Sequence, residues 1–155
     1  MKFKNPMLVV RDMEKSKKFY KDVLGLRVIM DFGANVTLTG GVALQTKESW
    51  KEFIQKDDNE IIFSGNDAEL YFEEDNFDSF IERLKALKYI EYVHHVYEHR
   101  WGQRVVRFYD LDKHIIEVGE NIKVVCKRFL DSGLTVEETA KKMDVPIKFV
   151  QACAK

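Results

Sequence analysis

The sequence predicts an α+β fold in which two βαβββ modules form a curved, mostly antiparallel sheet around a cup, followed by a C-terminal helical extension. Three observations lead to this prediction. The order of strand, helix and three strands occurs twice, glycines separate the strand segments, and residues 121–155 carry only helical patterns. The modules cover about residues 1–58 and 61–120, so residues 1–120 form one domain and residues 121–155 form a tail.

The first module begins with a strand at residues 5–10. An amphipathic helix follows, because Asp12 can cap its start, apolar residues recur at helical spacing, and Gly25 can end it. Three short strands and a short helix with a polar connector come next, at residues 26–32, 34–38, 41–46 and 47–60.

The second module repeats this order. Its first strand spans residues 68–74, and Asp75 and Asn76 can cap the helix that follows. A tight turn at residues 110–113 joins the last two strands. The three closing strands are expected at residues 90–98, 103–110 and 114–120.

Composition narrows the class of protein. The chain has 155 residues, of which 45% are hydrophobic, and a formal net charge of −1, so it has no overall basic character that would attract nucleic acid or an anionic membrane. The apolar run near its start is too short to span a membrane. Its two cysteines, Cys126 and Cys153, have no CxxC spacing and no nearby histidine, which indicates a reduced, cytoplasmic protein.

Strand alternation sorts the side chains onto two faces. Each strand has one strongly apolar face, which the two helices can cover. The opposite faces mix apolar with polar residues and predict the half-polar concave surface that a small-molecule site needs. The polar residues expected on it are Asn5, Gln45, Glu69, Tyr71, Arg107, Tyr109 and Glu117.

Two motifs carry a family resemblance. VVRDMEKSKKFYKDVLGLRV (residues 9–28) resembles the opening of the glyoxalase/bleomycin-resistance/dioxygenase, or vicinal oxygen chelate, superfamily. RFYDLDKHIIEVGE (residues 107–120) resembles the closing F-x-D-P-D-G-x-x-x-E-L pattern of that superfamily, with Leu111 for Pro and Lys113 for Gly. The resemblance covers residues 3–120 and implies the fold. Because the superfamily contains isomerases, dioxygenases, transferases and drug-sequestering proteins, the fold does not determine the reaction.

The resemblance also implies a site. Metalloenzymes of the superfamily bind a divalent ion with four ligands on strands that face the cup. The expected ion is Mg²⁺, Mn²⁺, Ni²⁺ or Zn²⁺, and a metal-free cup is the alternative. Two carboxylates and two amides suit hard cations better than they suit Zn²⁺. Without a metal, the two carboxylates are candidate acid and base. The four ligand positions fall on Asn5, Gln45 (Leu44 if the alignment shifts by one), Glu69 and Glu117.

Other residues are candidates for binding a substrate. Arg107 either clamps a carboxylate or phosphate, or forms an internal ion pair with Glu69 or Glu117. Three aromatic residues either line the pocket or fill it, namely Trp101 at the expected rim, Tyr71 and Tyr109. The histidines are mostly expected at the surface or in structural positions, at residues 94, 95, 99 and 114.

The tail predicts three helices. The first ends at Gly133, the second begins after a cap at Thr135, and Pro146 opens the third. The spacing of Ala140, Asp144 and Val150 resembles the helix-turn-helix segment of bacterial regulators, which implies DNA binding through residues 121–155. A helical appendage that packs on the domain or on a dimer partner is the alternative.

Three functions follow from these observations. The first is a glyoxalase-like lyase, isomerase or transferase that uses Glu69 and Glu117. The second is a metal-free ligand-binding or drug-sequestering protein for an anionic or aromatic compound. The third is a ligand-sensing regulator with a DNA-binding tail. The superfamily commonly pairs its modules through dimerisation, so the resemblance also implies a homodimer.

Overall fold

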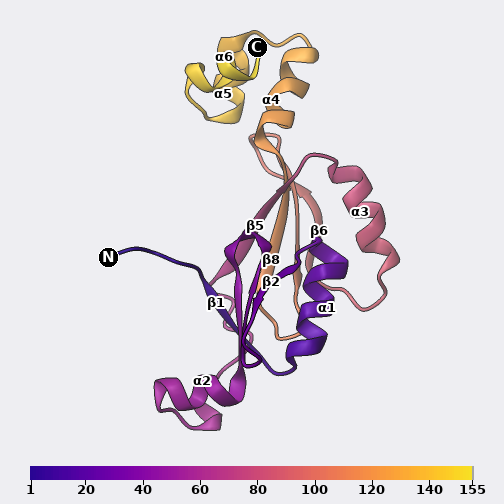
Figure 1. Cartoon of the computed structure of the whole chain (residues 1–155). Coiled ribbons are helices and arrows are strands. Elements are labelled where there is room, and N and C mark those ends of the chain that lie inside the picture. Colours follow the sequence, from indigo (N-terminus) through magenta and orange to yellow (C-terminus); the bar gives the residue numbers. More distant parts are fainter. Residues whose placement is uncertain (155) are drawn as a thin grey trace. The chain divides into compact units, whose positions relative to one another are not determined.

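The computed structural model of the protein describes residues 1–154, which fall into two compact units (Figure 1). Unit 1 contains residues 1–68 and the turn segment 109–115, and unit 2 contains residues 69–108 and the chain from residue 116 onward. Each module forms one four-stranded sheet. The predicted α+β fold with two βαβββ modules and a helical tail is thereby confirmed. Within residues 1–154, none of the helices is long and apolar enough to cross a membrane.

Unit 1 follows the predicted order of elements. Its strands are arranged β1-β4-β3-β2, with β1 parallel to β4 and β3 antiparallel to both of its neighbours. The Asp12 side chain accepts a hydrogen bond from the backbone N–H of Lys15 at 3.0 Å, and Gly25 ends the helix with a φ of 71°. The elements are β1 (Met7–Val10), α1 (Met13–Leu24), β2 (Val28–Asp31), β3 (Asn35–Leu38), β4 (Ala43–Thr46) and α2 (Lys47–Ile54).

The turn segment 109–115 belongs to unit 1 because its buried carboxylates bond to groups near α1. The Tyr20 hydroxyl donates to Asp110 at 2.7 Å, and the backbone N–H of Arg11 donates to Asp112 at 3.2 Å. His114 Nδ1 lies 2.8 Å from the Asp110 carboxylate. Burial alone would raise the pKa of Asp110, but the bonds from His114 and Tyr20 outweigh burial and hold this pKa below its usual value. Burial raises the pKa of Asp112.

These shifts predict how stability depends on pH. Asp110→Asn should lower the free energy of unfolding at neutral pH by about 2–3 kcal/mol, because charge-assisted hydrogen bonds are lost. Since the pKa of Asp110 is lower in the folded state, its contribution is present above the unfolded pKa and is lost as the pH falls through the folded one. Urea unfolding from pH 7 downward should therefore show the variant approaching wild type in acid. A difference in unfolding free energy that does not depend on pH would contradict this. Because burial raises the pKa of Asp112, the difference between wild type and Asp112→Asn should change with pH in the opposite direction.

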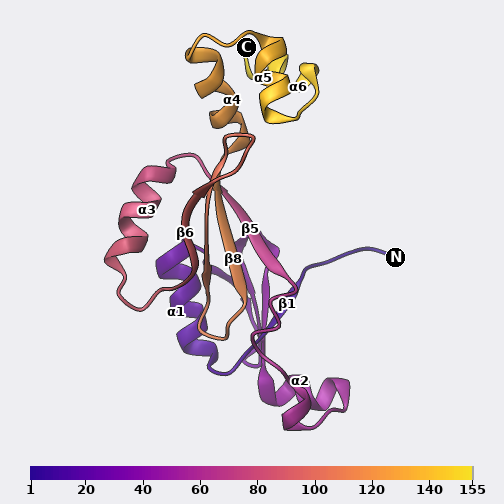
Figure 2. The same cartoon turned by 180° about the vertical axis from the view of Figure 1, so that it is seen from behind.

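Unit 2 contains the second sheet, in the order β5-β8-β7-β6. Helix α3 runs alongside this sheet (Figures 1 and 2) and buries its apolar side. Ile81 and Lys85 of α3 line a small groove together with Val106 of β7, so α3 covers the face of β7 that carries Val106. By strand alternation, Arg107 lies on the opposite face. The elements are β5 (Glu69–Glu74), α3 (Phe77–Ala86), β6 (Glu91–Glu98), β7 (Arg104–Tyr109) and β8 (Ile115–Glu120).

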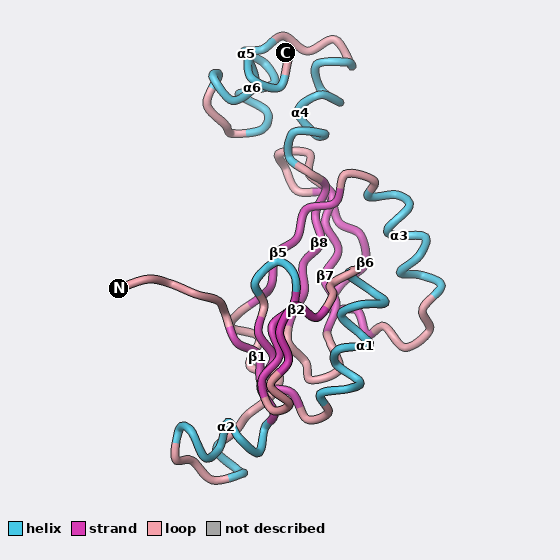
Figure 3. The backbone as a smooth tube through the Cα atoms, viewed as in Figure 1, coloured by secondary structure: helices cyan, strands magenta, loops and turns pink. Residues whose placement is uncertain are grey.

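The tail of unit 2 consists of three helices (Figure 3). They are α4 (Ile122–Asp131), α5 (Val136–Met143) and α6 (Ile147–Cys153). Their buried apolar side chains form one core. Thr135 and Glu138 form a capping box at α5, and Asp144 ends α5 in the left-handed conformation with a φ of 56°. The three predicted helices and the turn between α5 and α6 are therefore present. DNA binding through this tail stays a prediction.

Candidate functional site

Arg107 is the centre of a polar cluster on the sheet of unit 2. Its Nε donates to Glu69 Oε2 at 2.9 Å, and its Nη2 forms an ion pair with Glu117 Oε2. Its Nη1 lies 3.2 Å from His94 Nε2. The sheet order brings these residues together, because each of the four strands supplies one of them. The internal ion pairs expected for Arg107 are therefore present, and its role in binding a substrate stays a prediction.

The charge of this cluster is net negative. Two carboxylates and one guanidinium leave one negative charge in excess when His94 is neutral. The Glu117 side chain is only 7% exposed and that of Arg107 is 25% exposed, so solvent screens their pairing weakly. The face therefore has an acidic floor.

A divalent metal does not fit the cluster as it is arranged. A guanidinium that pairs with both carboxylates would repel a second cation beside them. Among residues 1–154, no group of three or more histidines, cysteines, aspartates or glutamates is placed to hold a metal ion. The metal ligands that the family resemblance implied in unit 2, Glu69 and Glu117, are thus already engaged.

A second row of side chains lies next to the cluster on the same face. Gly119 allows Val105 and Tyr71 to pack closely there, because a Cβ atom on it would lie only 3.3 Å from Val105 and 3.4 Å from the ring of Tyr71. Gln103 joins this row to the rim: its Nε2 donates to the Tyr71 hydroxyl at 2.9 Å, and its Oε1 accepts from Trp101 Nε1 at 3.1 Å. Trp101 is therefore fixed by its polar edge. We call this surface, defined by Glu69, Tyr71, Val105, Arg107, Glu117 and Gly119, the Arg107 face.

An aromatic cluster forms the wall beside Trp101. The rings of His99 and Trp101 are stacked, with centroids 4.1 Å apart and an interplanar angle of 9°. Tyr97 meets His99 edge to face at 5.0 Å. Burial lowers the pKa of His99, and the positive charge of Arg107 adds to this shift. The shift favours the neutral form of the His99 ring, which is the ring that stacks on Trp101.

The remaining predicted site residues belong to unit 1. Gln45 is fully buried in β4, and its Oε1 accepts from Asn35 Nδ2 at 2.7 Å, so its amide oxygen is engaged. Asn5 precedes β1 and is partly buried. The Tyr109 hydroxyl donates to Asn66 Oδ1 at 2.8 Å.

Sequence reasoning missed His94, His99 and Gln103. Alternation correctly indicated that His94 and His95 lie on opposite faces, since His94 contacts Arg107 while His95 lines the groove beneath α3. Which of them reaches Arg107 depends on the pairing of β6 with β7, and the sequence contains no signal for that register. Gln103 lies two residues after Trp101 and directly precedes β7. Of the three residues, its position beside Trp101 was therefore the easiest to predict from the sequence.

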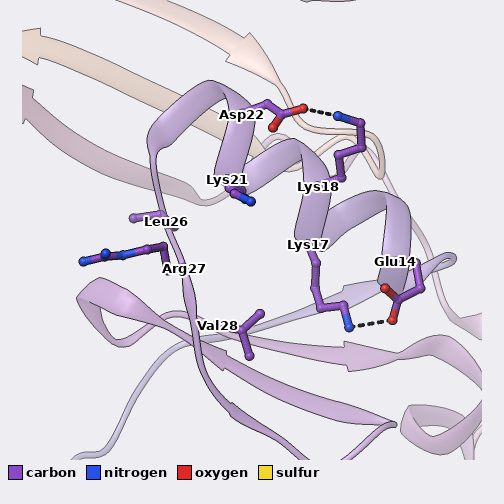
Figure 4. Close-up of a pocket in the computed structure, with 8 residues that line it drawn as sticks. All are labelled: Glu14, Lys17, Lys18, Lys21, Asp22, Leu26, Arg27 and Val28. Carbon is purple, nitrogen blue, oxygen red and sulfur yellow. Dashed lines mark hydrogen bonds and ion pairs between the residues drawn. The ribbon is translucent and has the colours of Figure 1, made fainter.

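A separate pocket of about 500 Å³ lies in unit 1, between α1 and the start of β2 (Figure 4). Ion pairs of Lys17 with Glu14 and of Lys18 with Asp22 cross its wall. None of the predicted site residues lines it. Its lining residues are Glu14, Lys17, Lys18, Lys21, Asp22, Leu26, Arg27 and Val28.

The two βαβββ modules have the fold of glyoxalase-like domains. A family model described as Glyoxalase-like domain matches residues 3–123, and the chain belongs to this family. The match ends at the start of α4, so most of the helical tail lies beyond it. A comparison with curated proteins gives no match.

Solved structures agree with this assignment. A protein of unknown function from Agrobacterium tumefaciens str. C58 is 38% identical, with a TM-score of 0.69 over 78% of this chain and 94% of that one. A lactoylglutathione lyase from Agrobacterium tumefaciens is 23% identical, with a TM-score of 0.60 over 78% and 94%. A glyoxalase/bleomycin resistance protein/dioxygenase family enzyme from Burkholderia phytofirmans PsJN is 18% identical, with a TM-score of 0.65 over 76% and 96%. The last two similarities concern the fold alone.

Proposed function

We propose that the protein binds a small organic molecule on the Arg107 face without using a metal. The observation that carries this proposal is the pairing of Arg107 with both Glu69 and Glu117. The pairing neutralises the only arginine of this cluster and occupies both carboxylates that a metal or an acid–base reaction would need. The function is therefore a binding or sequestering one, within the glyoxalase-like family.

The ligand class follows from charge and shape. The acidic floor disfavours an anion, because no unpaired positive charge of the cluster is left to hold it. The wall formed by Tyr97, His99 and Trp101 offers aromatic surface for stacking, and aromatic faces attract cations. A planar aromatic compound that carries a positive charge satisfies both features.

Calorimetric titration with phenyltrimethylammonium as the probe tests this proposal, with benzoate as a matched anion. We expect binding of the cation only. Trp101→Ala should weaken it by about tenfold, because cation–π and stacking contacts contribute roughly 1–2 kcal/mol. Trp50→Ala, in α2 of unit 1, is the control and should leave the affinity unchanged. Preferential binding of benzoate would contradict the proposed charge selectivity.

A metalloenzyme is the alternative that the same titration distinguishes. Mn²⁺, Ni²⁺ and Zn²⁺ are titrated into wild type and into Glu117→Gln. We expect no stoichiometric binding of these ions by wild type. Stoichiometric binding that the substitution abolishes would replace our proposal with a glyoxalase-like enzyme in which Glu117 leaves Arg107 to hold the metal.

We further propose that the protein is a cytoplasmic homodimer. Both cysteines are free thiols, as expected in a reducing compartment. Strand β2 is an edge of its sheet and exposes Val28, Ile29 and Met30, an apolar edge of the kind that a second subunit covers. A monomer mass in sedimentation equilibrium would exclude the dimer.

A further inference from the structure

We infer that Arg128, on helix α4 of the tail, is a positioning residue that holds the Trp101 wall of the ligand site in place. This inference rests on the proposed function, because it assigns the helical tail a role in the same site. Helix α4 follows directly after β8, with only Asn121 between them (Figure 2). The tail is therefore anchored to the strand that carries Glu117.

The first contact is between Arg128 and the loop that carries Trp101. Arg128 Nη2 donates to the backbone carbonyl of Gly102 at 2.6 Å. The loop turns sharply here, with the Gly102 N–H bonded to the His99 carbonyl at 2.8 Å and the His99 N–H bonded to the Gln103 carbonyl at 2.9 Å. A charged donor on the Gly102 carbonyl therefore holds the turn that positions both stacked rings.

The second contact is steric. Phe129, next to Arg128 on α4, lies so close to Gly102 that a Cβ atom on this glycine would be 2.2 Å from the end of its ring. Phe129 also belongs to the apolar core of the tail. The packing of the tail core and the position of the loop are consequently coupled through one ring.

The third contact runs through a buried carboxylate. Glu120 is 3% exposed, and it accepts from Arg128 Nη2 at 3.2 Å and from Arg104 Nη2 at 2.7 Å. Its backbone carbonyl accepts from Gln103 Nε2 at 2.8 Å, and Gln103 in turn accepts from Trp101 Nε1. Arg128 thus reaches Trp101 along two routes, the Gly102 carbonyl and the Glu120–Gln103 pair.

These contacts explain what the tail adds to the domain. The family match ends at residue 123, so Arg128 and Phe129 come from the segment beyond the common domain. A wall that is held before the ligand arrives costs less ordering on binding, which increases affinity. By linkage, a ligand on the Arg107 face should in turn stabilise α4.

The experiment uses the full chain with Trp50→Phe, which leaves Trp101 as the single tryptophan. Arg128→Met is compared with Lys127→Met, an exposed neighbour on the same helix that also loses one positive charge. We expect acrylamide quenching of Trp101 to increase about twofold in Arg128→Met. The affinity for phenyltrimethylammonium should fall about fivefold, because the wall is no longer held in place before the ligand binds. Lys127→Met should change neither, and Arg128→Lys should recover part of both.

Hydrogen exchange separates positioning from unfolding, because α4 should stay protected in Arg128→Met while the amides of residues 99–103 exchange faster. If α4 loses its protection, Arg128→Lys takes the place of this variant in the same comparison. Unchanged quenching and exchange of the loop in the variant that keeps α4 folded would overturn the inference. If the loop loosens but wild type does not bind the probe, the positioning role stands and the proposed function fails.

Discussion

Arg107→Met should lower the free energy of unfolding by about 3 kcal/mol at pH 7, because it leaves Glu117 buried and without its counter-charge. Glu69 and Glu117 then face each other without the guanidinium, and their repulsion adds to the cost of burial. Urea denaturation measures this loss. The same variant should bind phenyltrimethylammonium more tightly than wild type, since the face loses its positive charge.

The pH dependence of this variant identifies the cause. A buried carboxylate without a counter-charge is most stable where it can take up a proton. The difference from wild type should therefore shrink as the pH is lowered from 7 to about 5, where such groups protonate. Arg100→Met is the matched control, because the ion pair of Arg100 with Asp144 joins two side chains that are 83% and 80% exposed. A loss in Arg107→Met no larger than in this control would mean that solvent screens the cluster.

Gly102→Ala should be the most disruptive single change at the junction of tail and sheet. Gly102 has a φ of +86°, and the new Cβ atom would lie 2.2 Å from the Phe129 ring. The backbone conformation alone costs about 1–2 kcal/mol in a residue with a Cβ atom, and the displacement of a packed ring adds about 2 kcal/mol. Thermal and urea unfolding followed by circular dichroism should show the total loss.

Gly133→Ala isolates the steric part of this effect. Gly133 has a φ of +95°, yet nothing lies within 4 Å of where its Cβ atom would be. It should therefore cost only the backbone part, about 1–2 kcal/mol. Equal losses in the two variants would show that Phe129 moves away without cost, and would weaken the case for coupling between the tail and the Trp101 loop.

Local patterns were sufficient to predict the elements of this fold. Asp12 and Gly25 bound α1 as expected, and Thr135 and Pro146 mark the starts of α5 and α6, because caps and breakers act within one turn of the chain. Alternation likewise indicated that Glu69, Arg107 and Glu117 share a face, because side chains alternate along any strand.

Only the tertiary structure decided how these residues are used. Arg107 pairs with Glu69 and Glu117 because the sheet order places β8 between β5 and β7, which brings Glu69 to Arg107 although the two are 38 residues apart in sequence. The contact of Arg128 with Gly102 likewise depends on where α4 packs. The sequence by itself therefore determined the modules, the helical tail and the polar face. Strand order and helix packing, which depend on long-range contacts, decided that Arg107 is neutralised and that the tail supports the Trp101 loop.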